Sequence, residues 1–279
     1  MIIDCRLRPP TEEFVNFGFN RAFKELMVSA RYEGKIYPVS DFVKEMNEAG
    51  VTLGVVAARD VETTFKYKIS NEHVADLVRQ FPQSFVGLAG VDPNKGMDAV
   101  RELDHAIRNL GLKGLSLDPF MHRRPANDKK YYPLYAKCVE LDVAVMFTTG
   151  PAGFVPDAIM DHASPRVIDE VAMDFPALRI MISHGGYPWV TEAIAVTWRH
   201  PNVYLDMSGY EEFPGSEPYC KAANGLLKNK MLFASGHPYV PFKRALKVFD
   251  RLPINPEVRD NILYKNALAA LKLNDDVKS

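Results

Sequence analysis

The sequence has few cysteines, and they lie far apart. Cys5, Cys138 and Cys220 are the three cysteines among 279 residues. Because their number is odd and none belongs to a Cys-x-x-Cys pair, the sequence argues against a disulfide framework and against a structural zinc site. Reduced thiols are typical of a cytoplasmic protein, which is the location we expect.

Long apolar runs and blocks of one charge are also absent from the sequence. No uninterrupted apolar stretch reaches the roughly 20 residues that a membrane-spanning helix needs. The 34 Lys and Arg residues nearly balance the 35 Asp and Glu residues, for a formal net charge of −1. Without a basic patch, we expect neither a nucleic acid nor a membrane as a partner.

Short apolar runs typical of buried strands are present, and they alternate with amphipathic segments. The predicted strands are 2–6, 52–58, 85–90, 113–118, 143–148, 178–183, 203–207 and 231–235. Helical patterns lie between them at 41–49, 71–81, 97–110, 132–141, 164–175 and 187–199. This alternation predicts an α/β protein with parallel strands, and eight units fit one closed (β/α)8 TIM barrel over residues 1–279. A doubly wound open sheet is the alternative.

Residues 10–40 fit none of these units. The segment follows the first strand directly and places Phe14, Phe17, Phe19, Phe23 and Tyr32 in a polar setting. A long loop inside a compact domain is often functional. We predict a partly helical lid or an oligomer contact here, and we favour the contact, so that the protein would be a homo-oligomer.

The first strand carries two arginines, Arg6 and Arg8. Side chains two apart in a strand point to the same side, so the arginines should face one way, and Cys5 and Leu7 the other. Two adjacent guanidiniums repel each other, and arginine does not relieve the repulsion by losing its proton. The pair therefore needs an internal carboxylate or an anionic substrate.

Polar residues also stand where the other predicted strands end. In a (β/α)8 barrel the chemistry is assembled at the carboxyl ends of the strands. Strand ends are polar in any barrel, so the argument rests on their convergence. The residues that we consider for the site, besides Arg6 and Arg8, are Arg59, Asp118, Thr148, His184, Tyr187 and His237.

Four stretches of the chain resemble one known family. They are Ile2-Ile3-Asp4, the segment 182–189 (Ile-Ser-His-Gly-Gly-Tyr-Pro-Trp), the segment 231–238 (Met-Leu-Phe-Ala-Ser-Gly-His-Pro) and the segment 261–267 (Asn-Ile-Leu-Tyr-Lys-Asn-Ala). In this order they look like the amidohydrolase-related family of the amidohydrolase superfamily. The resemblance implies a (β/α)8 barrel, and family members include metal-dependent decarboxylases and hydratases and lactonases of dicarboxylate lactones.

The chain departs from this family at the metal ligands. The two histidines of the family's first strand correspond to Arg6 and Arg8, the histidine of its fifth strand to Thr148, and the aspartate of its eighth strand to Gly236; only the histidine of the sixth strand is kept, as His184. A guanidinium has no lone pair to donate, and its charge repels a cation. We therefore expect no metal and no cofactor, with Arg6 and Arg8 supplying the positive charge instead.

These expectations combine into a metal-independent hydrolase of a small carboxylated, ring-derived substrate, similar to a lactonase. His184 would act as the base, because nearby arginines favour its neutral form, and Asp118 would orient it or act as a second base. Decarboxylation and hydration are the rival reactions, and a non-catalytic barrel that binds an anion is the rival class. Substrate contacts are expected from Arg6, Arg8, Arg59, Thr148, Tyr187 and His237. The alternatives are internal salt bridges for Arg6 and Arg8, a surface cation for Arg59, packing core for Tyr187 and a loop residue for His237.

Overall fold

The computed structural model describes residues 1–18, 34–150, 155 and 157–273. Its main sheet has eight parallel strands that neighbour one another in chain order. Backbone hydrogen bonds of 3.0 Å from Cys5 to Phe233 and from Gly236 to Arg6 join the first and last strands. The strands are β1 (Ile3–Leu7), β2 (Leu53–Ala57), β5 (Phe85–Gly90), β6 (Gly114–Leu117), β7 (Ala144–Thr148), β8 (Ile180–Ser183), β9 (Val203–Asp206) and β10 (Met231–Leu232). The predicted (β/α)8 barrel is confirmed, and the open sheet is not.

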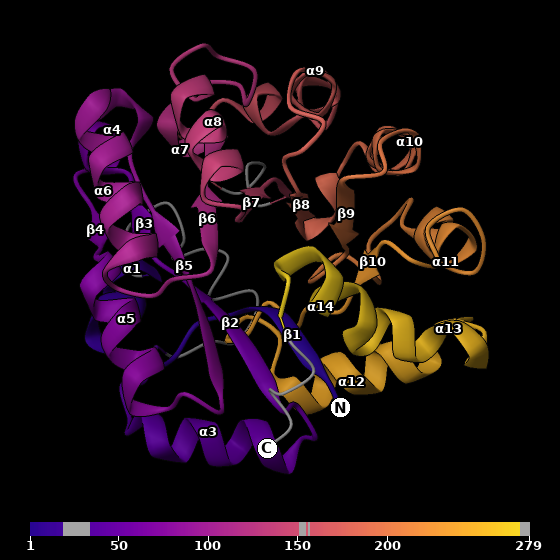
Figure 1. Cartoon of the computed structure of the whole chain (residues 1–279). Coiled ribbons are helices and arrows are strands. Elements are labelled where there is room, and N and C mark those ends of the chain that lie inside the picture. Colours follow the sequence, from indigo (N-terminus) through magenta and orange to yellow (C-terminus); the bar gives the residue numbers. More distant parts are fainter. Residues whose placement is uncertain (19–33, 151–154, 156, 274–279) are drawn as a thin grey trace.

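Helices surround the strands on the outside (Figure 1). One main helix of 7 to 12 residues follows each strand in turn: α3 (Val39–Glu48), α5 (Asn71–Gln80), α6 (Met97–Arg108), α8 (Tyr132–Glu140), α9 (Arg166–Asp174), α10 (Val190–Arg199), α11 (Glu217–Ala223) and α12 (Phe242–Arg251). Smaller elements decorate this frame: α1 (Glu12–Gly18), α4 (Glu62–Phe65), α7 (Pro119–His122), α13 (Pro256–Asp260), a π-helical turn (Asn261–Lys265), α14 (Asn266–Leu271) and an antiparallel pair, β3 (Arg59–Asp60) with β4 (Lys68–Ile69).

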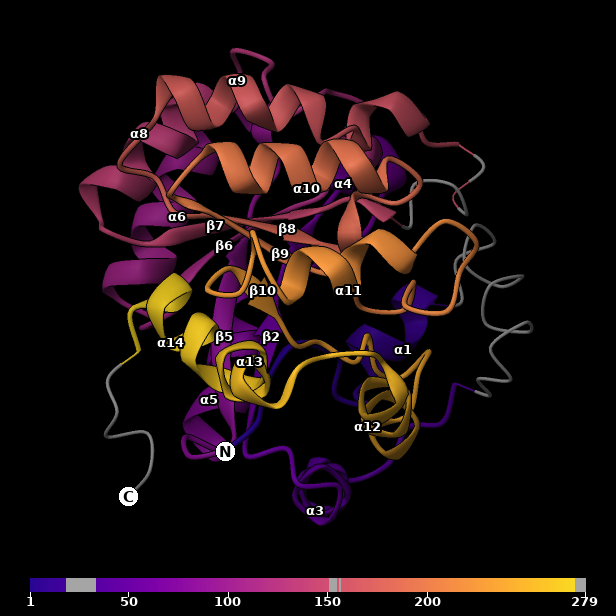
Figure 2. The same ribbon diagram turned by 90° about the vertical axis from the view of Figure 1, so that its right-hand side faces the viewer.

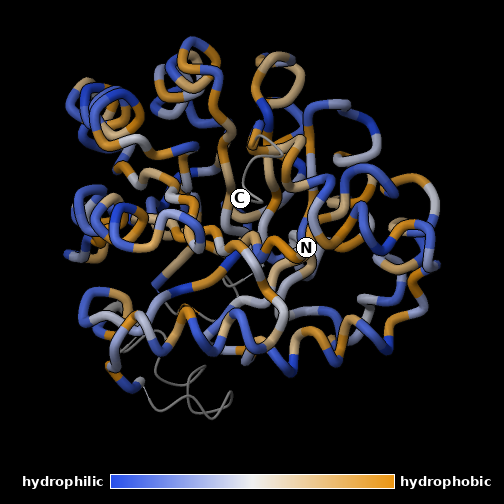
Figure 3. Tube along the Cα trace, turned by 60° about the horizontal axis from the view of Figure 1, so that its bottom comes forward, coloured by the Kyte–Doolittle hydropathy of each residue, from blue (hydrophilic) through white to orange (hydrophobic). Residues whose placement is uncertain are grey.

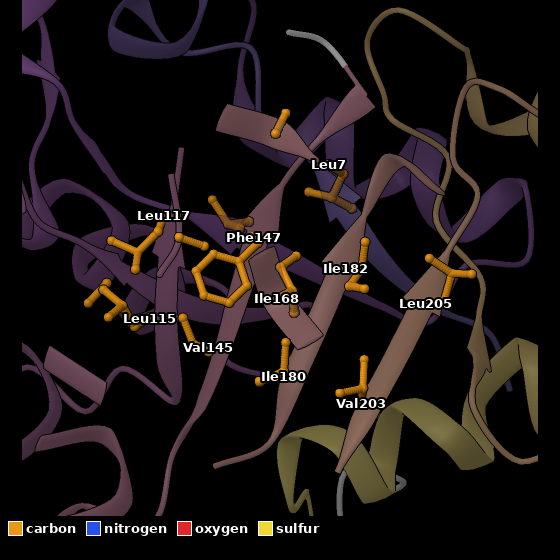
Figure 4. Close-up of a cluster of buried hydrophobic side chains, with 14 of the residues drawn as sticks. Leu7, Leu115, Leu117, Val145, Phe147, Ile168, Ile180, Ile182, Val203 and Leu205 are labelled. Carbon is orange, nitrogen blue, oxygen red and sulfur yellow. The ribbon is translucent and has the colours of Figure 1, made fainter. Parts of the chain in front are cut away.

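Strand alternation divides the apolar residues into two cores. One set, which includes Phe147 and Ile182, packs outward against helices, for example against Ile168 of α9 (Figure 4). The other set, which includes Met146 and Met181, fills the barrel. Hydrophobic stretches follow the strands, whereas the outer helices alternate between apolar and polar residues (Figure 3). This is the pattern from which the sequence predicts the fold.

The two ends of the barrel differ. Ala267, Ala270 and Leu271 of α14 belong to the inner apolar cluster, so this helix covers one end of the barrel. Helix α1 lies near the opposite end (Figure 2). Phe14 of α1 is buried, and its ring lies 5.9 Å from that of His73 on α5.

The predicted lid or oligomer contact over 10–40 is described in part. Residues 12–18 form α1, and residues 19–33 lie outside the described residues. No helix in the described ranges is long and apolar enough to cross a membrane.

Strand β1 corrects one detail of the prediction. Asp4 pairs with Gly54 and Leu7 with Val56, so three steps along β1 face two steps along β2. This extra residue is a β-bulge, which interrupts side-chain alternation. Cys5 consequently belongs to the inner cluster and Leu7 to the outer one, although simple alternation places them on the same side.

Candidate active site

Arg6 reaches across the inside of the barrel from β1. Its Nη2 donates to Thr148 Oγ1 at 2.8 Å, and its Nη1 lies 3.2 Å from Met146 Sδ and 3.4 Å from Ser116 Oγ. Arg6 is 3% exposed, and among the described residues no carboxylate forms an ion pair with it. A buried guanidinium held only by neutral acceptors remains a strong site for an anion.

Arg59 is held differently, by a buried carboxylate. Its Nε donates to Asp118 Oδ2 at 2.7 Å and its Nη2 to Asp118 Oδ1 at 2.6 Å, which is a bidentate pair. Burial acts to raise the pKa of Asp118, but the charge and hydrogen bonds of Arg59 lower it to about 2. With both oxygens engaged and so low a pKa, Asp118 is a poor base. The structure thus favours a positioning role for Asp118 over the predicted catalytic one.

Three arginines meet at one small pocket that is partly open to solvent. Arg6, Arg8 and Arg59 line it. Its apolar wall consists of Leu7, Phe14, Ala57 and Ile69. Burial, and then the charges of Arg8 and Arg59, lower the pKa of Arg6 to about 9. Because an arginine stays protonated at neutral pH, this shift reflects a buried charge first and neighbouring positive charge second, and both favour a bound anion.

His184 follows β8 in a tight left-handed turn. Its φ is +64°, and Gly185 and Gly186 follow with φ of +73° and +69°. A Cβ at Gly185 would lie 2.2 Å from Tyr219 Oη, and one at Gly186 would lie 2.8 Å from Ala193 Cβ. The His-Gly-Gly sequence therefore suits this turn, which has no room for larger residues.

The environment of His184 keeps its imidazole neutral. Burial, and then the charges of Arg6 and Arg8, hold the pKa of His184 well below 6.5. Its Nδ1 lies 3.0 Å from the carbonyl oxygen of Ser208. Its Nε2 is buried and has no hydrogen-bond partner in the part of the chain that the structure describes. A neutral imidazole keeps a lone pair on this ring nitrogen for a ligand or a proton, but the lowered pKa also makes His184 a weaker base than a free imidazole.

Two of the remaining predicted substrate contacts, Thr148 and Tyr187, lie at different distances from the site. Thr148 lies in the site through its hydrogen bond to Arg6. The ring of Tyr187 stacks on Tyr210 at 4.8 Å, and Tyr210 in turn meets His184 edge-on at 6.3 Å, so Tyr187 lies one ring away from the imidazole.

The ring of His237 lies in an aromatic cluster. It stacks on Phe242 at 4.3 Å and meets Phe42 edge-on at 5.1 Å, and burial lowers its pKa to about 3. This packing favours a structural role over the predicted substrate contact.

Two residues that the sequence reasoning did not select, Ser116 and Met146, hold Arg6. Asp206 and Ser208, which stand at the end of the predicted strand 203–207 and belong to the polar strand ends, surround the base of the His184 ring. Ser116 and Met146 stand two residues before Asp118 and Thr148 on their strands, so strand alternation could have identified them. The partners of His184 depend on how two separate strand ends meet, which no local pattern reveals.

The residues present do not fit a catalytic metal ion. The family resemblance implies ligands at five positions, and four of them hold unsuitable residues. Arg6 and Arg8 are cations, the hydroxyl of Thr148 is engaged with Arg6, and Gly236 has no side chain. Within the described ranges, no group of three or more His, Cys, Asp or Glu side chains is arranged to hold a metal ion. The donor chemistry therefore disagrees with the family's metal centre.

A (β/α)8 barrel with charged side chains gathered at its strand ends is typical of TIM-barrel enzymes. A family model described as "Amidohydrolase" matches residues 3–273, which is nearly the whole chain. The chain belongs to this family, as its four motifs predict.

Individual relatives match to different extents. The 2-keto-4-carboxy-3-hexenedioate hydratase of a Sphingobium species is 31% identical over 141 residues, which cover 43% of this chain and 41% of the hydratase. The match thus spans less than half of that relative.

Several solved structures match over nearly their full length. A TIM-barrel protein from Bordetella bronchiseptica has a TM-score of 0.82 and 30% identity, over 97% of this chain and 98% of that one. The 5-carboxyvanillate decarboxylase of Novosphingobium aromaticivorans, complexed with manganese, has a TM-score of 0.73 and 16% identity, over 98% and 96% of the two chains. The latter likeness is one of fold alone.

Proposed function

We propose that the chain is a metal-independent hydrolase of a small, carboxylated, ring-derived lactone or similar ester. The observation that carries this proposal is the meeting of Arg6, Arg8 and Arg59 at one cavity. Fixed cations bind a substrate carboxylate bidentately and stabilise an oxyanion as it develops. The neutral His184, within reach of the charges of Arg6 and Arg8, supplies a base.

The proposed reaction uses only side chains of this chain and water. Nε2 of His184 takes a proton from water, and the oxygen of that water bonds to the lactone carbonyl carbon. The negative charge that develops on the carbonyl oxygen is stabilised by the arginines. When the carbonyl re-forms, the ring C–O bond breaks, and the leaving oxygen takes the proton from His184. The product is an open-chain hydroxy acid.

Hydration of an unsaturated carboxylated acid is the second candidate. The match to a hydratase whose name denotes a tricarboxylic keto acid favours it. The same groups serve this reaction: His184 activates water for addition to a C=C bond, and the arginines stabilise the enolate that forms. Decarboxylation is the third candidate: the sequence match to a 2-amino-3-carboxymuconate-6-semialdehyde decarboxylase of Dictyostelium discoideum, 28% identical over 75 residues, favours it, but this match is shorter than that to the hydratase.

A substrate panel tests the proposal. Metal-stripped protein is incubated with carboxylated lactones, unsaturated keto dicarboxylates and hydroxybenzoates, and the products are identified by mass spectrometry. The proposal expects a gain of 18 mass units on a lactone, and loss of at least nine-tenths of kcat/KM in Arg6→Ala. A gain of 18 units only on unsaturated acids selects hydration. Saturable binding without any product selects the anion-binding barrel and overturns the proposal.

A further inference from the structure

A buried hydrogen-bond chain fixes which nitrogen of His184 carries the hydrogen. Nδ1 lies 3.0 Å from the carbonyl oxygen of Ser208 and 3.0 Å from its hydroxyl oxygen. A carbonyl oxygen can only accept, so a lone pair on Nδ1 would face it unfavourably. The hydrogen of a neutral imidazole therefore belongs on Nδ1.

The hydroxyl of Ser208 agrees with this assignment. Its oxygen lies 2.6 Å from Asp206 Oδ1, and a carboxylate can only accept, so the hydroxyl hydrogen is directed to Asp206. The hydroxyl oxygen then has lone pairs left for the Nδ1 hydrogen. Both contacts of Nδ1 thus require the same tautomer, and Nε2 keeps its lone pair.

Asp206 also fixes the backbone on both sides of this contact. Its Oδ1 accepts the backbone N–H of His184 at 3.0 Å and that of Ser208 at 3.0 Å. All three residues are buried, with exposures of 0% for Asp206 and Ser208 and 5% for His184. Through one carboxylate oxygen, Asp206 at the end of β9 thus fixes both the backbone of His184 and the Ser208 hydroxyl that accepts from the His184 ring.

We infer that Asp206 and Ser208 are positioning residues that hold His184 in the Nδ1–H tautomer and so keep a lone pair on Nε2. The kinetic consequence rests on the proposed function, whereas the tautomer does not. A base that needs Nε2 unprotonated gains from this arrangement, because no population is lost to the wrong tautomer.

The tautomer is measured directly by NMR of protein labelled with ¹⁵N-histidine, without any substrate. The His184 signals are assigned by their loss in His184→Gln. We expect a neutral ring with a protonated Nδ1 and an unprotonated Nε2. A ring protonated at Nε2 overturns the inference. Because this measurement needs no turnover, its failure is distinct from failure of the proposed function.

Ser208→Ala tests the positioning role. We expect kcat to fall about tenfold or more with KM within about twofold, and Ser208→Thr, which restores a hydroxyl, to recover most of the loss. The matched control is Thr149→Val, since Thr149 donates to Ser183 O and accepts from Gly186 N in the same turn without contacting the imidazole.

The control separates positioning from general damage to the turn. Thr149→Val should leave the His184 ¹⁵N shifts unchanged, whereas Ser208→Ala should move them. Equal losses of kcat in the two variants, with unmoved shifts in Ser208→Ala, contradict the positioning role. If the protein turns over no substrate but the His184 ring carries its hydrogen on Nδ1, the tautomer assignment stands and the proposed function fails.

Discussion

Arg6 and Arg59 are both buried cations, and they are stabilised in different ways. Arg59 has a bidentate carboxylate partner in Asp118, and Arg6 has a hydroxyl and a thioether among its neighbours. Burying a charge without a counter-charge is costly. Arg6, whose own hydrogen-bond acceptors are uncharged, therefore lowers the stability of the fold, as expected of a residue placed to bind an anion.

The Arg59–Asp118 pair predicts a large loss of stability when one partner is removed. Asp118→Ala leaves a buried guanidinium without its carboxylate, and we expect the free energy of unfolding to fall by about 3 kcal/mol. Asp76→Ala, which removes the partner of the exposed Arg79, is the control and should cost less than about 1 kcal/mol. Urea denaturation measures both values. Similar losses in the two variants would contradict the account of Asp118.

Asp4 predicts a particular dependence of stability on pH. Burial raises its pKa from 3.8 to about 7, against the hydrogen bonds from Ser235 and Arg6. A carboxyl whose pKa is raised by folding stabilises the fold below its unfolded pKa, and this contribution is lost as pH rises through the folded pKa. The window therefore runs from about pH 4 to about pH 8, and the full linkage is on the order of 4 kcal/mol.

Asp4→Asn isolates this contribution. Its carboxamide oxygen can still accept the two backbone N–H groups that now reach Asp4 Oδ1. We expect the melting temperature of the wild type to fall relative to that of Asp4→Asn between pH 5 and pH 8. Parallel melting curves over this range would show that Asp4 is already ionised in the folded protein.

At the scale of elements, β1 determines the geometry of the site. Arg6 and Arg8 line one cavity, as strand alternation predicts, but the bulge separates Cys5 from Leu7. A bulge has no signature in the four letters Cys-Arg-Leu-Arg, because it depends on the register with β2. The sequence therefore predicts the strand and its two arginines, whereas the sides on which Cys5 and Leu7 lie depend on the pairing with β2.

The register of β1 can be tested through Gly54 on β2. A Cβ at Gly54 would lie 2.2 Å from Leu7 Cδ2, so Gly54→Ala forces Leu7 to move. We expect a loss of about 1–3 kcal/mol in the free energy of unfolding. Leu7→Ala alone should cost about 2–5 kcal/mol. In the double variant the Gly54→Ala cost should nearly vanish, and additive losses would contradict the contact.

At the scale of the whole molecule, the barrel was predictable and parts of the site were not. The eight apolar runs at regular spacing lead to the eight strands, and the strand ends bring Arg6, Arg59 and His184 into mutual electrostatic range. His237 is the counter-example: it follows a strand end, yet Phe42 and Phe242 take its ring into the core. Residues distant in the sequence therefore determine whether a polar side chain at a strand end faces the site or packs in the hydrophobic core.

The central claim is that Arg6 and its neighbours bind an anionic ligand without a metal ion. Calorimetric titration with benzene-1,3-dicarboxylate tests it most directly, on protein dialysed against EDTA and on untreated protein. We predict the same Kd for both, at least about tenfold weaker binding by Arg6→Gln, and unchanged binding by the exposed-arginine control Arg79→Gln. Binding that requires an added divalent metal, or that survives Arg6→Gln unchanged in a folded variant, would contradict the account.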